Sequence, residues 1–489
     1  MQLGAVDWRQ KMLKSTRRNV NTKPPGEQKI MLFRLSIQNM MTLVSFNLML
    51  FLDRIILAKH GTASLSASLT AGSICNIFIF GAIAIASIAD VFIGRYFGAQ
   101  EHKKIGQIVW QMLWFSITIA GLFLLISIFG HQYLPLHSGF SSEAETYFRW
   151  QMAVGFLPVI IATLNSFFLG TQRFGFALIA VVVASLCKLI LVVPLVFGIN
   201  GFFSGFGIKG TISATAISQI LHIIILAWVV FRKSNRDRYG SGDCAIRPQV
   251  FLSCVRIGFP QCLGTMLNYA AWSTVVGLLT VAGEKHLMMY TIIDSLYALF
   301  GFTTEGLQKG VLAIAAGLIG SGQSAKVPAL FRNAVFLLVP ILLVLALPLL
   351  FFPDVVLFAF NDIRLNSVEI YSACFITWIH FCFDGLSWIL SGLLTALGDT
   401  FFVGPVNALA SIVSGVGVTY FMTKIVFCQP EITCWVSAIY GLFNAVLLLM
   451  RFRTWNFSET KAIAPSIAIP IFNPADINQP APALRFGSL

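Results

Sequence analysis

The chain has 489 residues, of which 57% are hydrophobic and 11% are charged, and its formal net charge is +13. Soluble domains carry about 25% charged residues, so a water-soluble fold is excluded. The cations are spread between apolar segments and are not gathered on a polar domain, which argues against a nucleic-acid partner. The composition indicates a polytopic membrane protein surrounded by lipid bilayer.

Apolar segments recur along nearly the whole chain. A helix needs about 20 apolar residues to cross the hydrocarbon core, and the chain holds twelve such segments. In chain order we predict membrane helices over residues 29–57, 62–94, 103–130, 143–169, 173–198, 207–231, 250–281, 286–318, 327–352, 367–394, 400–424 and 432–452. The predicted fold class is an all-α membrane protein with twelve transmembrane helices.

The basic residues predict the orientation of these helices. Cytoplasmic loops carry an excess of Lys and Arg, and such residues flank the even-numbered connections. The longest of these connections contains Arg232, Lys233, Arg236 and Arg238. We therefore predict that the even-numbered loops and both termini are cytoplasmic.

Composition also divides the chain into five parts. We predict a basic cytoplasmic segment, a six-helix lobe, a basic linker, a second six-helix lobe and a Pro-containing cytoplasmic tail, over residues 1–28, 29–231, 232–249, 250–452 and 453–489 respectively.

The nine cysteines include no CxxC pair, so neither a zinc site nor a disulfide scaffold is indicated. Cys428 and Cys434 share the predicted outer loop before the last helix. An oxidising compartment would favour a bond between them. The sequence leaves open either a disulfide or two unpaired thiols.

The two predicted lobes align as an internal repeat. A shift of 222 residues, with no gap, places several landmarks on one another: Arg34 on Arg256, Gly61 on Gly283, Leu65 on Leu287, Gly98 on Gly320 and Lys104 on Lys326. Because each copy has an even number of helices, we expect a pseudo-twofold axis along the membrane normal. Repeats of this kind place a substrate cavity between the halves and expose it alternately to each side. The alternative is a duplicated scaffold without a transport role.

Five local patterns stand on the expected helices. They are FLDRIILAKHGTASLSA at 51–67, VFIGRYFGAQEHKK at 91–104, GIKGTISATAISQ at 207–219, RIGFPQCL at 256–263 and FDGLSWILSGLLTALGDTFF at 383–402. In this order they resemble the multidrug and toxic compound extrusion (MATE) family over roughly residues 30–452. The resemblance implies two six-helix lobes around a central cavity, and antiport in which a drug or metabolite leaves as H⁺ or Na⁺ enters.

Ionisable side chains inside membrane helices cost at least about 2.5–3.5 kcal/mol, and they are therefore our candidate functional residues. Asp53 in the first helix and Asp384 in the tenth match the carboxylates of the family pattern. We expect Asp53 to load and release a proton, and Asp384 to bind H⁺ or Na⁺ or to face a cationic substrate. Lys188 in the fifth helix needs an acidic partner, and we predict that this partner is Asp53. The alternative for Asp53 is a snorkelling or Arg54-paired interfacial group. Asp90 is interpreted as a solvated helix end, and an interfacial or gate role is its alternative.

The eighth predicted helix carries three charged residues, Asp294, Glu305 and Lys309. Glu305 and Lys309 stand four residues apart in the favourable order for an ion pair, so a structural pair and a functional role both stay open. Asp294 lies about three helical turns before Glu305. We predict that the three form one stripe that faces the second-lobe cavity near Asp384.

The chain departs from the family pattern at both ion sites that the family implies. Asn268 stands where sodium-coupled relatives have Glu, and Val193 stands where proton-coupled relatives have Asp. Asn268 and Asp384 remain candidate Na⁺ ligands through their oxygen atoms. The coupling ion stays open between H⁺ and Na⁺, with H⁺ favoured, and no other cofactor is expected.

Four aromatic residues are candidates to line the second-lobe cavity and to hold flat organic cations: Tyr269, Trp272, Tyr290 and Tyr297. For each of them the alternative is ordinary packing or a place in an interfacial belt.

The chain has no P-loop, HExxH or GxSxG motif, which argues against an ATP-driven pump or a hydrolase. We predict a secondary active antiporter, not an enzyme, that exports organic cationic or amphipathic compounds in exchange for H⁺ or Na⁺. The alternative is a flippase for lipid-linked saccharides or a metabolite exporter, from the superfamily that includes the MATE family. We expect a small-molecule substrate, and a monomer in a bacterial inner membrane.

Overall fold

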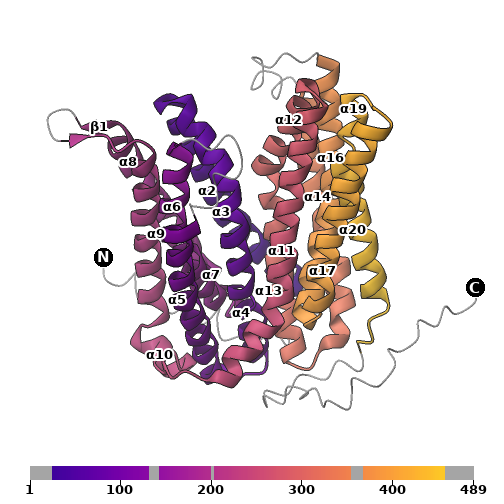
Figure 1. Ribbon diagram of the computed structural model, residues 1–489. Helices are drawn as coiled ribbons and strands as arrows, with labels where there is room; N and C mark the ends of the chain where they lie inside the picture. The colour runs from indigo at the N-terminus through magenta and orange to yellow at the C-terminus, as the bar shows by residue number, and fades with distance from the viewer. Residues whose placement is uncertain (1–24, 131–141, 200–202, 354–366, 458–489) are drawn as a thin grey trace, which may run out of the picture.

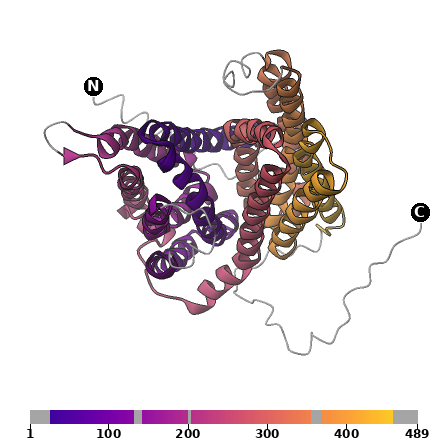
Figure 2. The ribbon, with the colours of Figure 1, turned by 45° about the horizontal axis from the view of Figure 1, so that its top comes forward.

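The computed structural model describes residues 25–130, 142–199, 203–353 and 367–457. Its helices form two bundles that stand side by side, one indigo to magenta and one red to yellow (Figures 1 and 2). We call them the N lobe (α2 to α9) and the C lobe (α11 to α20). The basic segment before residue 25, the tail after residue 457 and the side chain of Arg54 lie outside the described residues.

The N lobe contains the first half of the helical elements. They are α2 (Pro25–His60), α3 (Thr62–Ala86), α4 (Ala89–Gly98), the short turn η2 (His102–Lys104), α5 (Ile105–Phe129), α6 (Ser142–Val154), α7 (Phe156–Gly170), α8 (Phe174–Phe197) and α9 (Ile208–Val230). Two antiparallel strands of two residues each, β1 (Gly198–Ile199) and β2 (Phe203–Ser204), connect α8 to α9.

The C lobe follows the short helix α10 (Lys233–Tyr239). Its elements are α11 (Pro248–Ala282), α12 (Glu284–Phe300), α13 (Phe302–Gly320), η4 (Ser324–Lys326), α14 (Val327–Ala346), η5 (Leu347–Phe351), α16 (Ser367–Leu397), α17 (Thr400–Ala410), η6 (Ser411–Gly417), α18 (Val418–Tyr420), η7 (Phe421–Ile425), α19 (Pro430–Thr433) and α20 (Val436–Arg453).

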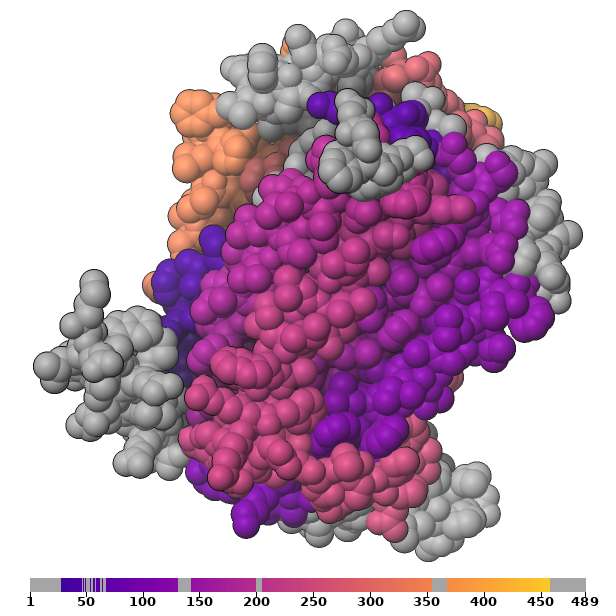
Figure 3. Space-filling view, turned by 90° about the vertical axis from the view of Figure 1, so that its left-hand side faces the viewer, coloured from indigo at the N-terminus to yellow at the C-terminus, as the bar shows by residue number. Residues whose placement is uncertain are grey.

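Joined across short breaks, these elements make twelve consecutive helical runs within the described ranges, at the predicted positions. Ten runs are long and apolar enough to cross a membrane, and the bent pair α12–α13 raises the number to eleven among the residues that were described. Exposed apolar side chains such as Ile190, Ile224 and Trp228 cover the outer faces of α8 and α9, part of the N-lobe face in Figure 3. The predicted fold class, an all-α membrane protein, is confirmed.

Four predicted helices are interrupted. The run 432–452 breaks at Cys434 and Trp435, between α19 and α20. The run 62–94 ends one helix at Ala86 and begins another at Ala89, 143–169 breaks at Gly155, and 286–318 breaks at Gly301 with a bend of 43°. Glycine lacks the side chain that would pack against the neighbouring turn and weakens a helix interior, which is the physical reason for the breaks at Gly155 and Gly301.

The internal repeat is visible in the element boundaries. The shift of 222 residues carries the start of α3 at Thr62 onto the start of α12 at Glu284, and η2 onto η4. It also carries the end of α4 at Gly98 onto the end of α13 at Gly320. The two lobes therefore repeat the same path of breaks and turns.

The lobes meet along matching helices: α3 packs against α11, and both α2 and α4 pack against α13. At Gly98 an added Cβ would collide with the backbone carbonyl of Gly317, and at Gly320 with that of Arg95. Under the repeat these two contacts are the same contact seen from either lobe. The pseudo-twofold axis therefore passes between α4 and α13, as in the self-matching interface of a symmetric dimer.

The basic connection between the lobes is docked and not loose. Tyr239 is fully buried, the Trp110 Nε1 donates to the Ser241 carbonyl at 2.8 Å, and the Gln111 Nε2 donates to the Ala245 carbonyl at 2.9 Å. We call this end of the molecule, which carries α10 at the bottom of Figure 1, the basic end. It also holds exposed or half-buried cations: Lys103, Lys104, Arg173, Arg236, Arg238 and Lys326.

We predict that Gly98→Val and Gly320→Val each lower the free energy of unfolding by about 1–3 kcal/mol, the usual cost of overpacking. Each change forces a side chain into the backbone of the opposite lobe. Equilibrium unfolding in mixed micelles measures the effect. Gly121→Val is the control, because an added Cβ meets nothing within 4 Å there. Equal stability of the Gly98 and Gly121 variants would contradict the close approach of the lobes.

Candidate functional site

The N lobe holds a buried ion pair. The Lys188 Nζ on α8 lies 2.5 Å from the Asp53 Oδ2 on α2, and the two side chains are 6% and 17% exposed. Apolar residues of the same helices, among them Ile56 and Val192, pack nearby. The predicted pairing of Asp53 with Lys188 is confirmed. Each charge therefore compensates the other in a medium that would penalise either alone.

The C lobe holds a buried carboxylate of a different kind. Asp384 on α16 is 5% exposed, and the Thr304 hydroxyl on α13 donates to its Oδ2 at 3.1 Å. Tyr297 from α12 and Trp388 from the next turn of α16 lie beside the same carboxylate. Three helices thus surround Asp384 with neutral polar and aromatic groups.

Glu305 is the residue after Thr304 and lies close enough to Asp384 for the two carboxylates to interact. Among the described residues, neither carboxylate forms an ion pair. Two acids that share a poorly hydrated region repel each other when both are ionised. The arrangement therefore favours the capture of a cation, either a proton or a metal ion.

Lys309 does not form its ion pair with Glu305. Its Nζ lies 2.8 Å from the Oδ2 of Asp90 on α4, in the opposite lobe. The side chain of Asp90 is 4% exposed, so the interpretation of Asp90 as a solvated helix end is wrong. A partner from the other lobe is decided by how the lobes pack, which helical spacing within one segment does not reveal.

Asp294 lies on α12, before the bend at Gly301, whereas Glu305 and Lys309 lie on α13. The prediction of one continuous helical stripe through all three is therefore wrong. Asp294 is exposed and interacts with Tyr290 on its own helix. Of the three, Glu305 interacts with Asp384.

Asn268 on α11 is tied into the C lobe by its amide nitrogen. The Nδ2 donates to the Ser411 Oγ at 2.5 Å and to the Tyr440 hydroxyl at 3.2 Å. A cation would have to bind through the remaining carbonyl oxygen. The described residues contain no cluster of three His, Cys, Asp or Glu side chains suited to a metal ion, and the Na⁺ site at Asn268 and Asp384 stays a prediction.

The four candidate aromatics separate into distinct contacts. Trp272 stacks on Tyr290 and meets Tyr440 edge-on, with ring centroids 6.2 and 5.2 Å apart. Tyr297 stacks on Phe381 at 5.7 Å, beside Asp384. Tyr269 reaches across the lobe boundary.

The contact of Tyr269 joins the lobes. Its ring lies parallel to that of Phe80 on α3, with centroids 4.9 Å apart. At the basic end, the Arg95 guanidinium on α4 donates to the Ala396 carbonyl on α16 through Nε at 3.2 Å and Nη2 at 2.7 Å. Ring stacking, hydrogen bonds and the Lys309–Asp90 ion pair therefore all connect the two lobes.

Sequence reasoning missed four residues of these sites: Asp90 as an ion-pair partner, and Thr304, Trp388 and Tyr440 as neighbours of the polar groups. A partial signal was present for Thr304, because it precedes Glu305 on the same helix. Trp388 stands four residues after Asp384, which places it on the same helix face. Asp90 and Tyr440 carried no comparable signal, because their partners lie on other helices.

Both cysteines of the predicted outer loop are free thiols. Of the two alternatives that the sequence left open, the disulfide between Cys428 and Cys434 is not formed in the structure. The short helix α19 separates the two residues, and Cys434 is buried with Met289 and Ile292 of α12. Packing of Cys434 into this core is the physical reason that the alternative of unpaired thiols holds.

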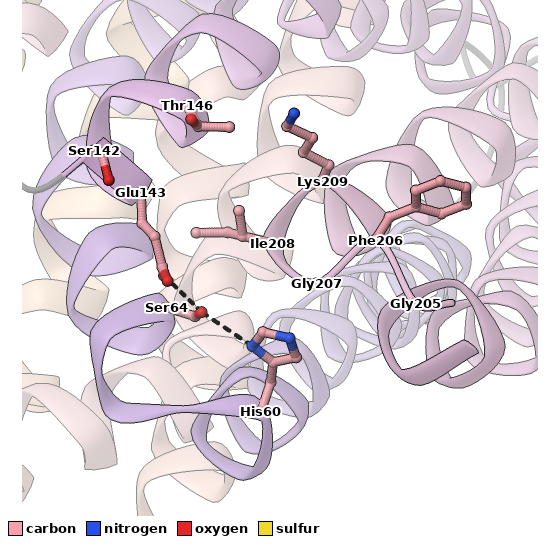
Figure 4. A pocket seen from close by; sticks show the side chains of 10 residues that line it. All are labelled: His60, Ser64, Ser142, Glu143, Thr146, Gly205, Phe206, Gly207, Ile208 and Lys209. Carbon is pink, nitrogen blue, oxygen red and sulfur yellow. Dashed lines mark hydrogen bonds between the residues drawn. The ribbon is translucent and has the colours of Figure 1, made fainter. Parts of the chain in front are cut away.

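A small polar pocket of about 350 Å³ lies at the end of the N lobe opposite the basic end (Figure 4). In it the Ser64 hydroxyl donates to the Glu143 Oε2 at 2.7 Å and lies 3.1 Å from the His60 Nδ1. Lys209 lines the opposite wall. None of the predicted site residues lines this pocket.

Comparison with known proteins gives one consistent result. Residues 39–193 match the MatE family model. A probable multidrug resistance protein NorM of Synechocystis is 20% identical over 439 residues, which cover 86% of this chain and 92% of that protein. A protein of the same name from Mesorhizobium japonicum is 24% identical over 311 residues, covering 61% of this chain and 66% of that protein.

Solved structures of similar fold cover nearly the whole chain. The outward-facing conformation of a multidrug resistance MATE family transporter matches with a TM-score of 0.76 at 20% identity, over 89% of this chain and 97% of that one. A eukaryotic MATE transporter matches with a TM-score of 0.74 at 18% identity, over 89% and 98% of the two chains.

We predict that Lys188→Met lowers the free energy of unfolding by about 3 kcal/mol, because it leaves Asp53 charged and unpaired in an apolar region. The double variant Asp53→Asn/Lys188→Met should recover most of this loss. Equilibrium unfolding in mixed micelles measures both. Arg247→Met is the control, since both partners of the Arg247–Asp243 pair are 43% exposed and such pairs contribute about 0–1 kcal/mol. If Lys188→Met costs no more than this control, the pair does not stabilise the N lobe.

Proposed function

Because the chain belongs to the MATE family, we propose that it is a secondary active antiporter that exports organic cationic or amphipathic compounds in exchange for H⁺ or Na⁺. The observation that carries the proposal is the buried Asp384, with Glu305 beside it and no cationic side chain paired with either among the described residues. We assign the coupling ion to this pair of carboxylates in the C lobe.

The choice of lobe follows from charge compensation. A carboxylate inside a membrane helix is costly unless something neutralises it. For Asp53 the neutralising group is Lys188, so a second cation gains little by binding there. For Asp384 the direct contact is a hydroxyl, and a bound H⁺ or Na⁺ would remove the cost. The expected proton-carrying role therefore belongs to Asp384 and not to Asp53.

The contacts between the lobes support alternating access. If the basic end is cytoplasmic, as the excess of Lys and Arg there indicates, then the Arg95–Ala396 and Lys309–Asp90 contacts close the cytoplasmic side. Figure 1 shows the ribbons of the two lobes closest together at this end. In the proposed cycle these contacts break, and the lobes rock to expose the C-lobe carboxylates to the cytoplasm.

The aromatic rings near Asn268 support an organic cation as cargo. Trp272, Tyr290 and Tyr440 present adjoining faces and edges, and a cation over such a ring gains about 0.5–2 kcal/mol. Tyr297 adds a ring beside Asp384. A flat cation that contacts both the rings and a carboxylate would compete with the coupling ion, as antiport requires.

A flippase for lipid-linked saccharides would need cationic groups that hold phosphates. The two lysines deep in the described helices, Lys188 and Lys309, are already paired with carboxylates. This pairing favours the export of organic cations. We further propose a bacterial inner membrane location and a monomer, with no cofactor besides the coupling ion.

Flux in proteoliposomes tests the proposal. We expect an imposed pH gradient or Na⁺ gradient to drive the transport of ethidium, a flat organic cation, by the wild-type protein. Asp384→Asn should reduce this flux about tenfold or more, since a hydrogen bond or cation contact to a charged group contributes about 1.5–3 kcal/mol. Asp53→Asn should reduce it less.

The matched control is Glu369→Gln. Glu369 is a buried carboxylate on the same helix, 8% exposed and bonded to Lys285, remote from the Asp384 cluster along α16. Its flux should stay near the wild-type value. Full flux in Asp384→Asn would remove the assigned role, and ethidium flux that no ion gradient drives would remove ion-coupled antiport.

A further inference from the structure

The Lys309–Asp90 pair joins a helix of each lobe. Lys309 lies on α13 and Asp90 on α4, with Nζ and Oδ2 2.8 Å apart. The acid is almost fully buried, whereas the lysine side chain is 34% exposed. When the lobes separate at the basic end, this pair must break, and a buried charge without a partner is strongly unfavourable.

The pair is an asymmetric addition to a symmetric interface. The repeat places Asp90 on Leu312 and Lys309 on Ser87, so neither charge has a counterpart in the other lobe. The surrounding glycine contacts, in contrast, are reciprocal. Close packing of α4 on α13 therefore does not by itself require an acid and a base at this place.

Lys309 has a second acid within its own helix. Glu305 stands one turn earlier on α13, at the spacing and in the order that favour an ion pair. The two side chains already interact electrostatically, and Glu305 interacts with Asp384 as well. One ammonium group is therefore ion-paired with an acid of the opposite lobe and also interacts with Glu305 of the C-lobe acid pair.

We propose that Lys309 exchanges partners during the transport cycle: it binds Asp90 while the lobes touch at the basic end, and Glu305 when they part there. In the first state Glu305 and Asp384 are left to the coupling ion. In the second state the ammonium replaces that ion, which leaves to the water at the basic end. Lys309 is thus a positioning residue that links ion release to the movement of the lobes.

This inference rests on the proposed function, but its central test does not require transport. Spin labels on the exposed Lys103 of η2 and Lys326 of η4 report the distance between the lobes at the basic end. They are introduced as labelled non-natural amino acids, because the chain has nine cysteines. Electron–electron double resonance in nanodiscs then gives the ratio of open to closed molecules.

Partner exchange predicts a specific pattern. Asp90→Asn removes the partner of the closed state and should raise the open-to-closed ratio about fivefold or more, the usual lower bound for such couplings. The double variant Asp90→Asn/Glu305→Gln also lacks the partner of the open state. Its open-to-closed ratio should be lower than that of Asp90→Asn by a similar factor, and therefore near the wild-type ratio. Lys309→Gln loses both partners at once, so its ratio should stay near that of the wild type.

A simple latch predicts a different pattern. In a simple latch, Lys309 pairs with Asp90 in the closed state and has no partner in the open state. Asp90→Asn and Lys309→Gln would then raise the open-to-closed ratio equally, and Glu305→Gln would not change it. Either of these results overturns the exchange, as does an unchanged ratio in Asp90→Asn. Asp399→Asn is the control, because the Asp399–Arg451 pair lies within the C lobe and should leave the ratio unchanged.

Ion-driven flux is a second measurement, and it distinguishes a failure of the proposed function from a failure of the partner exchange. Asp90→Asn should raise the external ion concentration needed for half-maximal ethidium flux about fivefold or more, because the freed Lys309 competes for Glu305. Lys309→Gln should not raise it. If no gradient drives flux in the wild type, the proposed function fails, while the distance measurements still decide the exchange of partners.

Discussion

The cost of an uncompensated charge in a membrane interior governs this structure. Each buried ionisable group in the described helices meets that cost in its own way. Asp53 and Lys188 neutralise each other within the N lobe, and Asp90 and Lys309 neutralise each other across the lobes. Asp384 accepts a hydrogen bond from the Thr304 hydroxyl and has the acid Glu305 nearby, with no ion pair among the described residues. The difference singles out the C-lobe carboxylates as the place where a cation has most to gain by binding.

The duplicated architecture explains why two similar lobes differ in chemistry. Backbone features such as the glycine contacts of Gly98 and Gly320 obey the repeat, since they set how closely the lobes approach. The buried acids and lysines discussed above do not obey it. The repeat places Asp53 on Val275, and Asp90 and Lys309 have neutral counterparts. A symmetric scaffold thus carries different buried charges in its two lobes, with Asp53 ion-paired in the N lobe and Asp384 without an ion pair among the described residues.

The interface between the lobes combines strong geometric matching with few polar bonds. Reciprocal packing of α4 and α13 provides a close apolar contact. The Arg95–Ala396 hydrogen bonds and the Lys309–Asp90 ion pair add polar contacts that require a specific orientation of the lobes. Such an interface is compatible with two states, because a small number of polar contacts must be exchanged when it opens. In the proposed exchange, Glu305 accepts Lys309 when the interface opens.

The amino-acid sequence alone determined the class of protein, the order of its helices, the repeat at 222 residues and the pairing of Asp53 with Lys188. These follow from hydrophobic run length, from periodicity and from the need of a lone lysine in a membrane helix for an acidic partner. The tertiary structure decided the rest. In the tertiary structure Lys309 forms its ion pair with Asp90, and the bend at Gly301 separates Asp294 from the predicted stripe. Cys434 packs in a core cluster and is not bonded to Cys428. The partner of Lys309 and the packing of Cys434 depend on contacts between residues far apart in the chain, and the spacing along a single helix carries no information about such contacts.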